Sequence, residues 1–190
     1  MTHPTSENGS GQAPTPTGDL YREVQPMHSN MLVRVGIFLE FPILLAVLLP
    51  IVLTSSAPGR WFPVLIVVPV VLGSAAFLYA LRLTTIVTPD ELVVKFPPFP
   101  GRRVPIAAIR SAESIRYNAL ASGGWGWRMS GKYHRIFNVT GDQGVLVVFG
   151  SEPNHKFLLG SRDADALAEA IELARFAHAD SPTPSEQHVH

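Results

Sequence analysis

Two apolar segments that lie close together constrain this chain more than any other feature. They cover residues 35–53 and 61–81, and Glu40 and Arg60 are the only charged residues from the start of the first segment to the end of the second. Each segment is close to the roughly 20 residues that an α-helix needs to cross about 30 Å of hydrocarbon. A soluble domain rarely keeps so long a stretch nearly free of charge, because its surface faces water. The segments therefore predict two transmembrane helices.

The connection between these helices, residues 54–60, is short and rich in turn-forming residues, so residues 31–82 are expected to form an antiparallel helical hairpin. Four prolines lie within the two segments: Pro42, Pro50, Pro63 and Pro69. Membrane helices tolerate proline because neighbouring helices and local adjustments satisfy the carbonyls that it frees. A buried helical hairpin in the core of a soluble protein is the alternative interpretation.

Basic residues near the ends of the segments predict the orientation. They flank the hairpin on its outer sides at Arg22, Arg34, Arg82, Lys95, Arg102 and Arg103. The connecting loop contributes only Arg60. Because cytoplasmic loops carry the excess of lysine and arginine, both termini are expected in the cytoplasm of a multi-pass protein of the plasma membrane.

Glu40 is the one ionisable residue inside a predicted span. Carboxylates within the membrane are costly and are often functional, which makes a proton or ion pathway one hypothesis. The structural alternative is that Glu40, about a turn and a half after Arg34, pairs with Arg34 or Arg82 or reaches water at the interface. The second segment offers only Ser74 and Tyr79 to continue a relay, which favours the structural alternative.

The two ends of the chain are polar and rich in small residues. Residues 1–30 and 180–190 cannot bury enough apolar surface to offset the entropy of ordering, so both are expected to be disordered tails. The chain has no cysteine, which excludes disulfides, thiol catalysis and thiolate metal sites. Its net charge is zero, so no overall field favours nucleic acid as a partner.

Residues 83–179 show the pattern of a small β domain. Short apolar or alternating segments are separated by turn residues, which is typical of antiparallel strands. The expected strands are residues 83–87, 92–96, 104–109, 112–117, 135–140, 145–149 and 155–159. Gly141 and Gly144 suit a tight hairpin loop between the fifth and sixth strands, whereas residues 96–101 are too rich in proline for a strand interior.

A helix is expected after Gly160. Ser161 or Asp163 suits its N-cap, and acidic residues in the first turn complement the helix dipole. Its apolar stripe consists of Leu167, Ala170, Ile171 and Ala174, widened by Leu173 and Phe176. The stripe predicts that the helix packs on the sheet or closes one end of a barrel.

About seven short antiparallel strands followed by one amphipathic helix is the element order of a pleckstrin-homology (PH) domain. Residues 31–179 resemble the bacterial PH-like membrane proteins, in which a two-helix hairpin leads directly into such a domain. The stretches that carry the resemblance are Thr85–Val94, Val104–Ile109, Gly123–Arg128, Gly144–Val148 and Leu159–Arg162. The resemblance implies a membrane hairpin plus an α+β domain built as a PH-like barrel or sandwich, and most members of the family have no assigned activity.

The sequence contains none of the common catalytic motifs: no HExxH, no P-loop, no GxSxG and no Rossmann fingerprint. His134, His155 and Asp142 fall on different predicted elements, where solvent-facing side chains are the simpler interpretation. We therefore expect no enzyme activity, no cofactor and no metal site.

The segment Gly123–Arg128 is the most distinctive candidate for binding. Its glycines allow a tight backbone, and Trp125, Trp127 and Arg128 suit an interfacial anchor or the contact surface of a protein partner. The structural alternative is a glycine-bent strand whose tryptophans cover one end of the domain. Arg102 and Arg103 begin a basic stretch that anionic lipid would attract, although a solvated polar face explains it equally.

These features predict a non-catalytic, membrane-anchored binding module that scaffolds a protein partner or senses lipid head groups at the cytoplasmic face. The bilayer is its expected partner, together with anionic lipid or an unidentified protein. The alternative is an accessory subunit of a transport or envelope-assembly system, in which the hairpin and Glu40 are the working parts.

Overall fold

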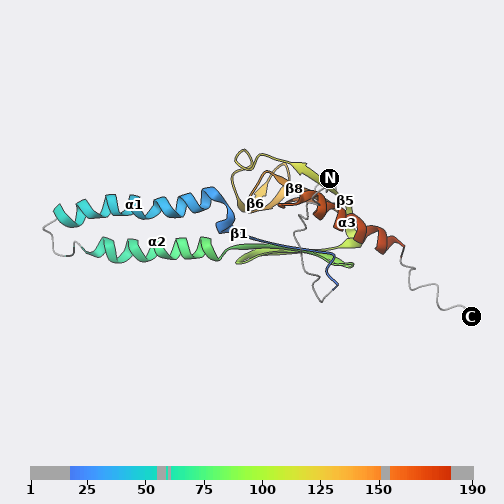
Figure 1. Cartoon of the computed structure of the whole chain (residues 1–190), viewed down its shortest axis with the longest axis horizontal. Coiled ribbons are helices and arrows are strands. Elements are labelled where there is room, and N and C mark those ends of the chain that lie inside the picture. The colour runs from blue at the N-terminus through green and yellow to red at the C-terminus, as the bar shows by residue number, and fades with distance from the viewer. Residues whose placement is uncertain (1–17, 55–58, 60, 151–154, 181–190) are drawn as a thin grey trace, which may run out of the picture.

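The two apolar segments form the longest helices of the protein. A computed structural model describes residues 18–54, 59, 61–150 and 155–180. Helix α1 (Met31–Thr54) and helix α2 (Phe62–Ala80) lie side by side and extend away from the rest of the chain (Figure 1). Both are long and apolar enough to cross a membrane, and Leu48 is the one residue of the two helices that is buried. The helical character predicted for both segments is confirmed, and the exposure is unlike that of a hairpin buried in a soluble core.

A strand precedes the hairpin, where a disordered tail was expected. Strand β1 (Tyr21–Pro26) pairs antiparallel with β2 (Arg82–Val87), in register from Tyr21 opposite Val87 to Pro26 opposite Arg82. The prediction of a tail up to residue 30 is therefore wrong for its last ten residues. The strand escaped detection because its buried positions are polar: Glu23 and Gln25 are 6% and 1% exposed. The rest of both predicted tails, residues 1–17 and 181–190, lies outside the described residues.

The first sheet has the order β1-β2-β3-β4. Strand β3 (Glu91–Phe96) forms the predicted hairpin with β2 and pairs on its other side with β4 (Phe99–Pro105). The prediction of a strand at residues 104–109 is wrong in its bounds, since the chain leaves β4 through a short 3-10 turn, η2 (Ile106–Ala108). Pro100 is accommodated because β4 is an edge strand, where a missing N–H is tolerated.

The second sheet has the order β5-β8-β9-β7-β6. Its strands are β5 (Ile109–Arg116), β6 (Gly126–Ser130), β7 (His134–Asn138), β8 (Gln143–Phe149) and β9 (Lys156–Gly160). Strands β7 and β8 do not form the predicted hairpin. Strand β9 lies between them, antiparallel to β8 and parallel to β7. The sheet is therefore mixed and not purely antiparallel.

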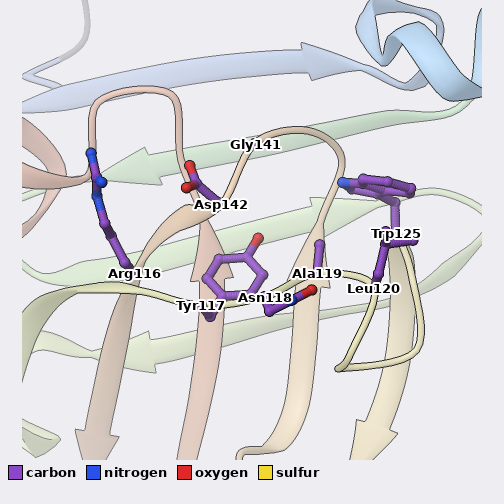
Figure 2. A pocket seen from close by; sticks show the side chains of 8 residues that line it. All are labelled: Arg116, Tyr117, Asn118, Ala119, Leu120, Trp125, Gly141 and Asp142. Carbon is purple, nitrogen blue, oxygen red and sulfur yellow. The ribbon is translucent and has the colours of Figure 1, made fainter.

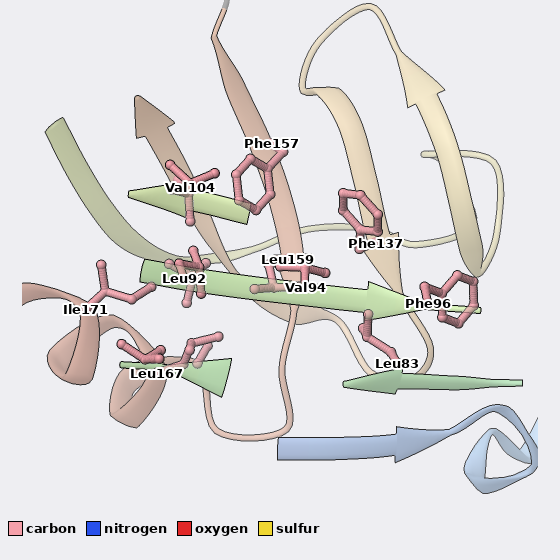
Figure 3. Close-up of a cluster of buried hydrophobic side chains, with 14 of the residues drawn as sticks. Leu83, Leu92, Val94, Phe96, Val104, Phe137, Phe157, Leu159, Leu167 and Ile171 are labelled. Atoms are coloured by element: carbon pink, nitrogen blue, oxygen red, sulfur yellow. The ribbon is translucent and has the colours of Figure 1, made fainter. Parts of the chain in front are cut away.

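The core fills the space between the two sheets and is covered by the C-terminal helix (Figure 3). Helix α3 (Ala164–Ala179) begins at the N-cap Asp163, whose carboxylate accepts a hydrogen bond from Ala166 N at 3.0 Å. The stripe of Leu167, Ala170, Ile171 and Ala174 is buried, as predicted. Leu173 and Phe176 do not widen it, because they are 59% and 68% exposed.

The described residues thus form an α+β domain of nine strands in two sheets and one C-terminal helix, with a two-helix hairpin attached. The α+β class is as predicted. The two sheets are not joined into one closed sheet, so a PH-like barrel is not confirmed, and the strand number exceeds the expected seven.

The helical hairpin is inserted between two paired strands and is held at both ends. Between β1 and α1 lie a 3-10 turn, η1 (Met27–Ser29), and the cap residue Asn30, whereas Leu81 alone separates α2 from β2. Met27 N donates to Leu81 O at 2.8 Å, and the His28 ring stacks on the Tyr79 ring at 4.3 Å. Neither helix is connected to the domain through a flexible linker.

Candidate binding site

A pocket of about 610 Å³ opens where several strands of the second sheet end (Figure 2). Its lining comes from the end of β5, the β5–β6 connection and the β7–β8 turn: Arg116, Tyr117, Asn118, Ala119, Leu120, Trp125, Gly141 and Asp142. Figure 2 shows Arg116 at one end of the pocket and Trp125 at the other, with Tyr117 between them. The pocket therefore presents one cation, one carboxylate and two aromatic rings on a single surface.

The β5–β6 connection is a compact loop stabilised by its own backbone. Ser122 N and Gly124 N donate to Asn118 O and Ala119 O at 3.0 and 2.7 Å. Gly123, Gly124 and Gly126 have φ values of +96°, +99° and +113°. Side chains rarely adopt such angles, so the glycines are required by the path of the loop. The loop leaves Leu120 67% exposed beside the pocket.

Tyr117 and Asn138 attach the pocket to the sheet beneath it. The Asn138 amide nitrogen donates to the Tyr117 hydroxyl at 3.0 Å, and Gly126 N donates to the Asn138 side-chain oxygen at 3.1 Å. Burial raises the pKa of the Tyr117 hydroxyl. The floor of the pocket is therefore fixed by buried polar contacts.

The residues predicted at Gly123–Arg128 do not form one contact surface. Trp125 lines the pocket, and its buried indole Nε1 has no hydrogen-bond partner in the part of the chain that the structure describes. Trp127 lies in β6 and packs against the main core instead, with its ring stacked on Phe99 at 5.8 Å. Arg128 is half-buried and burial lowers its pKa. Within the described residues its Nε and Nη2 have no hydrogen-bond partner. Trp125 precedes the first residue of β6, Gly126, whose φ is +113°, so the alternation of that strand does not place it beside Trp127. Of these three residues only Trp125 lines the pocket.

The adjacent residues Arg102 and Arg103 also point apart. Arg103 Nη1 donates to Glu91 Oε1 at 3.1 Å on the exposed face. The Arg102 guanidinium lies over the Phe149 ring, 4.5 Å from its centroid. Neither residue lines the pocket with Trp125.

Glu40 lies inside the helical hairpin and faces α2. Ser74 Oγ is 3.1 Å from Glu40 Oε1 and 2.9 Å from Val71 O, so the single hydroxyl proton has two acceptors. The partner found for Glu40 is thus Ser74 of the opposite helix, and neither Arg34 nor Arg82.

A buried carboxylate that the sequence did not reveal joins β1 to the start of α3. Glu23 accepts hydrogen bonds from Ser161 Oγ at 2.7 Å, from Arg162 N at 3.0 Å and from Arg162 Nε at 3.2 Å. The Tyr21 hydroxyl donates to the same carboxylate at 3.1 Å. With its carboxylate oxygens accepting these hydrogen bonds, Glu23 connects the first sheet to the β9–α3 junction.

Three lining residues of the pocket, Arg116, Tyr117 and Asp142, were not recognised as a site from the sequence. Their proximity depends on the pairing of β5 with β8, which places Arg116 opposite Gln143. No local pattern encodes that pairing. Within the described ranges, no group of three or more histidine, cysteine, aspartate or glutamate side chains is arranged to hold a metal ion.

Comparisons with protein-family models, with curated proteins and with solved structures find no match for this chain. Any proposal for its function therefore rests on the geometry described above.

Proposed function

We propose that this protein is a non-catalytic binding module fixed in the plasma membrane, and that its pocket of Arg116, Tyr117, Trp125 and Asp142 holds a segment of a protein partner. One observation carries the proposal: tryptophan, tyrosine and arginine, the residue types that dominate binding energy at protein interfaces, gather on one concave surface. The exposed Leu120 beside them adds an apolar contact.

A protein partner is favoured over an anionic lipid at this pocket. Arg116 and Asp142 together leave the lining without net charge. A lipid phosphate entering the pocket would approach the Asp142 carboxylate and be repelled, whereas a polypeptide offers both donors and acceptors.

The proposed domain type is a variant of the PH-like fold, with two sheets and a C-terminal helix around one core. The mixed second sheet and the additional strands are departures from the simple pattern of seven antiparallel strands. The accessory-subunit alternative has less support, because Glu40 has a hydrogen-bond partner within the hairpin itself.

In the proposed topology α1 and α2 cross the bilayer and both termini are cytoplasmic. The chain lacks cysteine, so introduced cysteines give an unambiguous test. A membrane-impermeant maleimide should label Gly59→Cys in the loop of intact cells, and should label Glu169→Cys on α3 only after lysis. Labelling of Glu169→Cys in intact cells would reverse the orientation.

The pocket is tested with a photo-crosslinking residue at Leu120 of the full-length chain in its native membrane. We expect a discrete crosslinked protein whose yield falls about tenfold with Arg116→Ala or Asp142→Ala, which corresponds to about 1.4 kcal/mol of binding. The matched control carries the crosslinker at Met129, which is exposed on β6 and does not line the pocket. Equal crosslinking from both positions, or no effect of the alanine variants, would exclude the pocket as the binding site.

A further inference from the structure

Two arginines, one on a strand of each sheet, lie at the edge of the core between the sheets. Arg102 precedes Val104 by two residues on β4, and Arg135 precedes Phe137 by two residues on β7. Side chains two residues apart in a strand share a face. Val104 and Phe137 are both buried in the core (Figure 3), so Arg102 and Arg135 lie where that core ends, and both are half-buried.

Aromatic rings of the second sheet bring these arginines to the same place. The Arg102 guanidinium lies 4.5 Å from the centroid of the Phe149 ring, and that ring is 5.8 Å from the Phe157 ring. Phe157 of β9 pairs in register with Arg135 of β7. Burial lowers the pKa of Arg102, and the nearby charge of Arg135 lowers it further. The two cations are therefore close enough to repel each other.

Neither cation is neutralised by a carboxylate in the part of the chain that the structure describes. The contrast with Arg103 is direct, because Arg103 forms an ion pair with Glu91 at 3.1 Å one position further along β4. In addition, the Nε of Arg135 is buried and has no hydrogen-bond partner among the described residues. Half-buried like charges and an unsatisfied donor are costly unless an anion completes them.

We propose that Arg102 and Arg135 form a binding site for a phosphate group at this edge of the domain. Two guanidinium groups match the charge of about −1.5 to −2 of a phosphomonoester at neutral pH, whereas a single carboxylate neutralises only one of them. Arginine also binds phosphate oxygens through paired N–H donors. The site is separate from the pocket of Tyr117 and Trp125, and it does not depend on the partner proposed there.

The position of the site leaves two sources for the phosphate. Arg102 lies in β4 opposite Val94 of β3, and Val94 is opposite Thr85 of β2. Thr85 is three residues from the start of β2 beside the end of α2, which is about 10 Å along the strand. That distance is within reach of a lipid head group if α2 crosses the bilayer, and the edge is also open to a soluble phosphomonoester.

The test uses the full-length chain in maltoside micelles, which contain no phosphate, and follows the thermal unfolding midpoint. Inorganic phosphate is titrated at constant ionic strength against chloride. The second arm compares phosphatidylcholine nanodiscs with and without phosphatidic acid. A ligand that binds the folded state raises the midpoint in a saturable way. We expect Arg102→Gln and Arg135→Gln each to weaken the apparent affinity about tenfold, and the matched control Arg103→Gln to leave it unchanged.

The two arms separate the sources of the phosphate. A saturable, arginine-dependent shift with inorganic phosphate identifies a soluble ligand, and a shift with phosphatidic acid alone identifies a lipid head group. The absence of a shift in both arms would overturn the proposal. An equal loss of affinity in the Arg103→Gln control would also overturn it, since that result indicates a general charge effect. If a glutamine variant does not fold, Arg102→Lys and Arg135→Lys preserve the charge without the paired donors. Unchanged affinity in these lysine variants would likewise overturn the proposal.

Discussion

The side-chain amide of Asn30 donates a hydrogen bond to the backbone carbonyl of Val139 at 2.8 Å, across 109 residues of sequence. The other end of the same side chain caps α1, because Asn30 Oδ1 accepts from Leu32 N at 2.9 Å. One buried residue, 4% exposed, therefore fixes the start of the apolar helix to the second sheet. Any reorientation of α1 relative to the domain must break this contact.

Replacing Asn30 by alanine is expected to destabilise the protein by about 2–3 kcal/mol, because the cap is lost and the buried Val139 carbonyl loses its donor. The thermal unfolding midpoint in detergent should fall by roughly 5–10 °C. The Asn30→Asp variant keeps the capping oxygen and loses only the donor. Equal midpoints for the alanine variant and the unchanged protein would mean that α1 is not held through this residue.

The polar strand β1 should be essential to the domain although it lies before the hairpin. Glu23→Ala leaves the buried Ser161 hydroxyl and the Arg162 amide without their acceptor, and we expect a loss of about 2–3 kcal/mol. Glu23→Gln retains an acceptor oxygen and should lose less. Hydrogen exchange provides the measurement: amides of β2 that face β1 should exchange faster in Glu23→Ala. Unchanged exchange there would show that β1 contributes little to the first sheet.

Alkaline pH should weaken the same contact through Tyr21. Burial raises the pKa of this phenol to about 12, and the neighbouring Glu23 charge acts in the same direction. The folded state thus disfavours the phenolate, so the contribution of Tyr21 to stability is complete below pH 10 and is lost as the pH rises from 10 to about 12. In Tyr21→Phe the unfolding midpoint should fall less steeply over that range. Parallel pH curves for the two proteins would contradict this assignment.

Gly160 is expected to tolerate no side chain. A Cβ at this position would lie 2.7 Å from the Cβ of Asn138 and 3.1 Å from the Tyr117 hydroxyl, within the buried contacts beneath the pocket. Gly160→Ala should therefore cost about 1–3 kcal/mol or displace Asn138. Gly131→Ala is the matched control, because a Cβ there meets nothing within 4 Å. Similar unfolding midpoints for both variants would show that the strands can separate to make room.

Local patterns in the sequence predicted the elements whose partners are close in the chain. The two apolar segments predicted α1 and α2, and an apolar stripe at helical spacing predicted α3. Short apolar or alternating segments predicted the β2–β3 hairpin. Strand β1 was missed because polarity predicts exposure, and three of the four hydrogen bonds that Glu23 accepts come from donors about 140 residues away.

Long-range pairing accounts for the other errors. The glycines of the β7–β8 turn favour a hairpin locally, but β9 inserts between these strands, and nothing near the turn signals that insertion. The Gly123–Arg128 segment was recognised as distinctive, yet Trp127 in β6 packs against the main core, whereas Trp125, which precedes β6, packs against the second cluster of buried residues. The pocket itself depends on residues that only the pairing of β5 with β8 brings together.

The contact between Glu40 and Ser74 in the apolar hairpin allows a structural role of the Glu40 carboxylate to be tested. Ser74 Oγ lies 3.1 Å from Glu40 Oε1, so the pair connects α1 to α2 within the apolar hairpin. Hydrogen bonds between membrane helices contribute about 0.6 kcal/mol on average, because the unfolded state also finds partners. A double-mutant cycle of Glu40→Ala and Ser74→Ala in lipid nanodiscs should therefore give a coupling energy of about 0.5–1 kcal/mol. Glu40→Gln retains an acceptor oxygen, and its hairpin should be as stable as that of the unchanged protein. If Glu40→Gln abolishes the activity of the protein in cells while membrane insertion and the stability of the hairpin remain normal, that activity requires the negative charge of Glu40. A structural role alone would then no longer explain this residue.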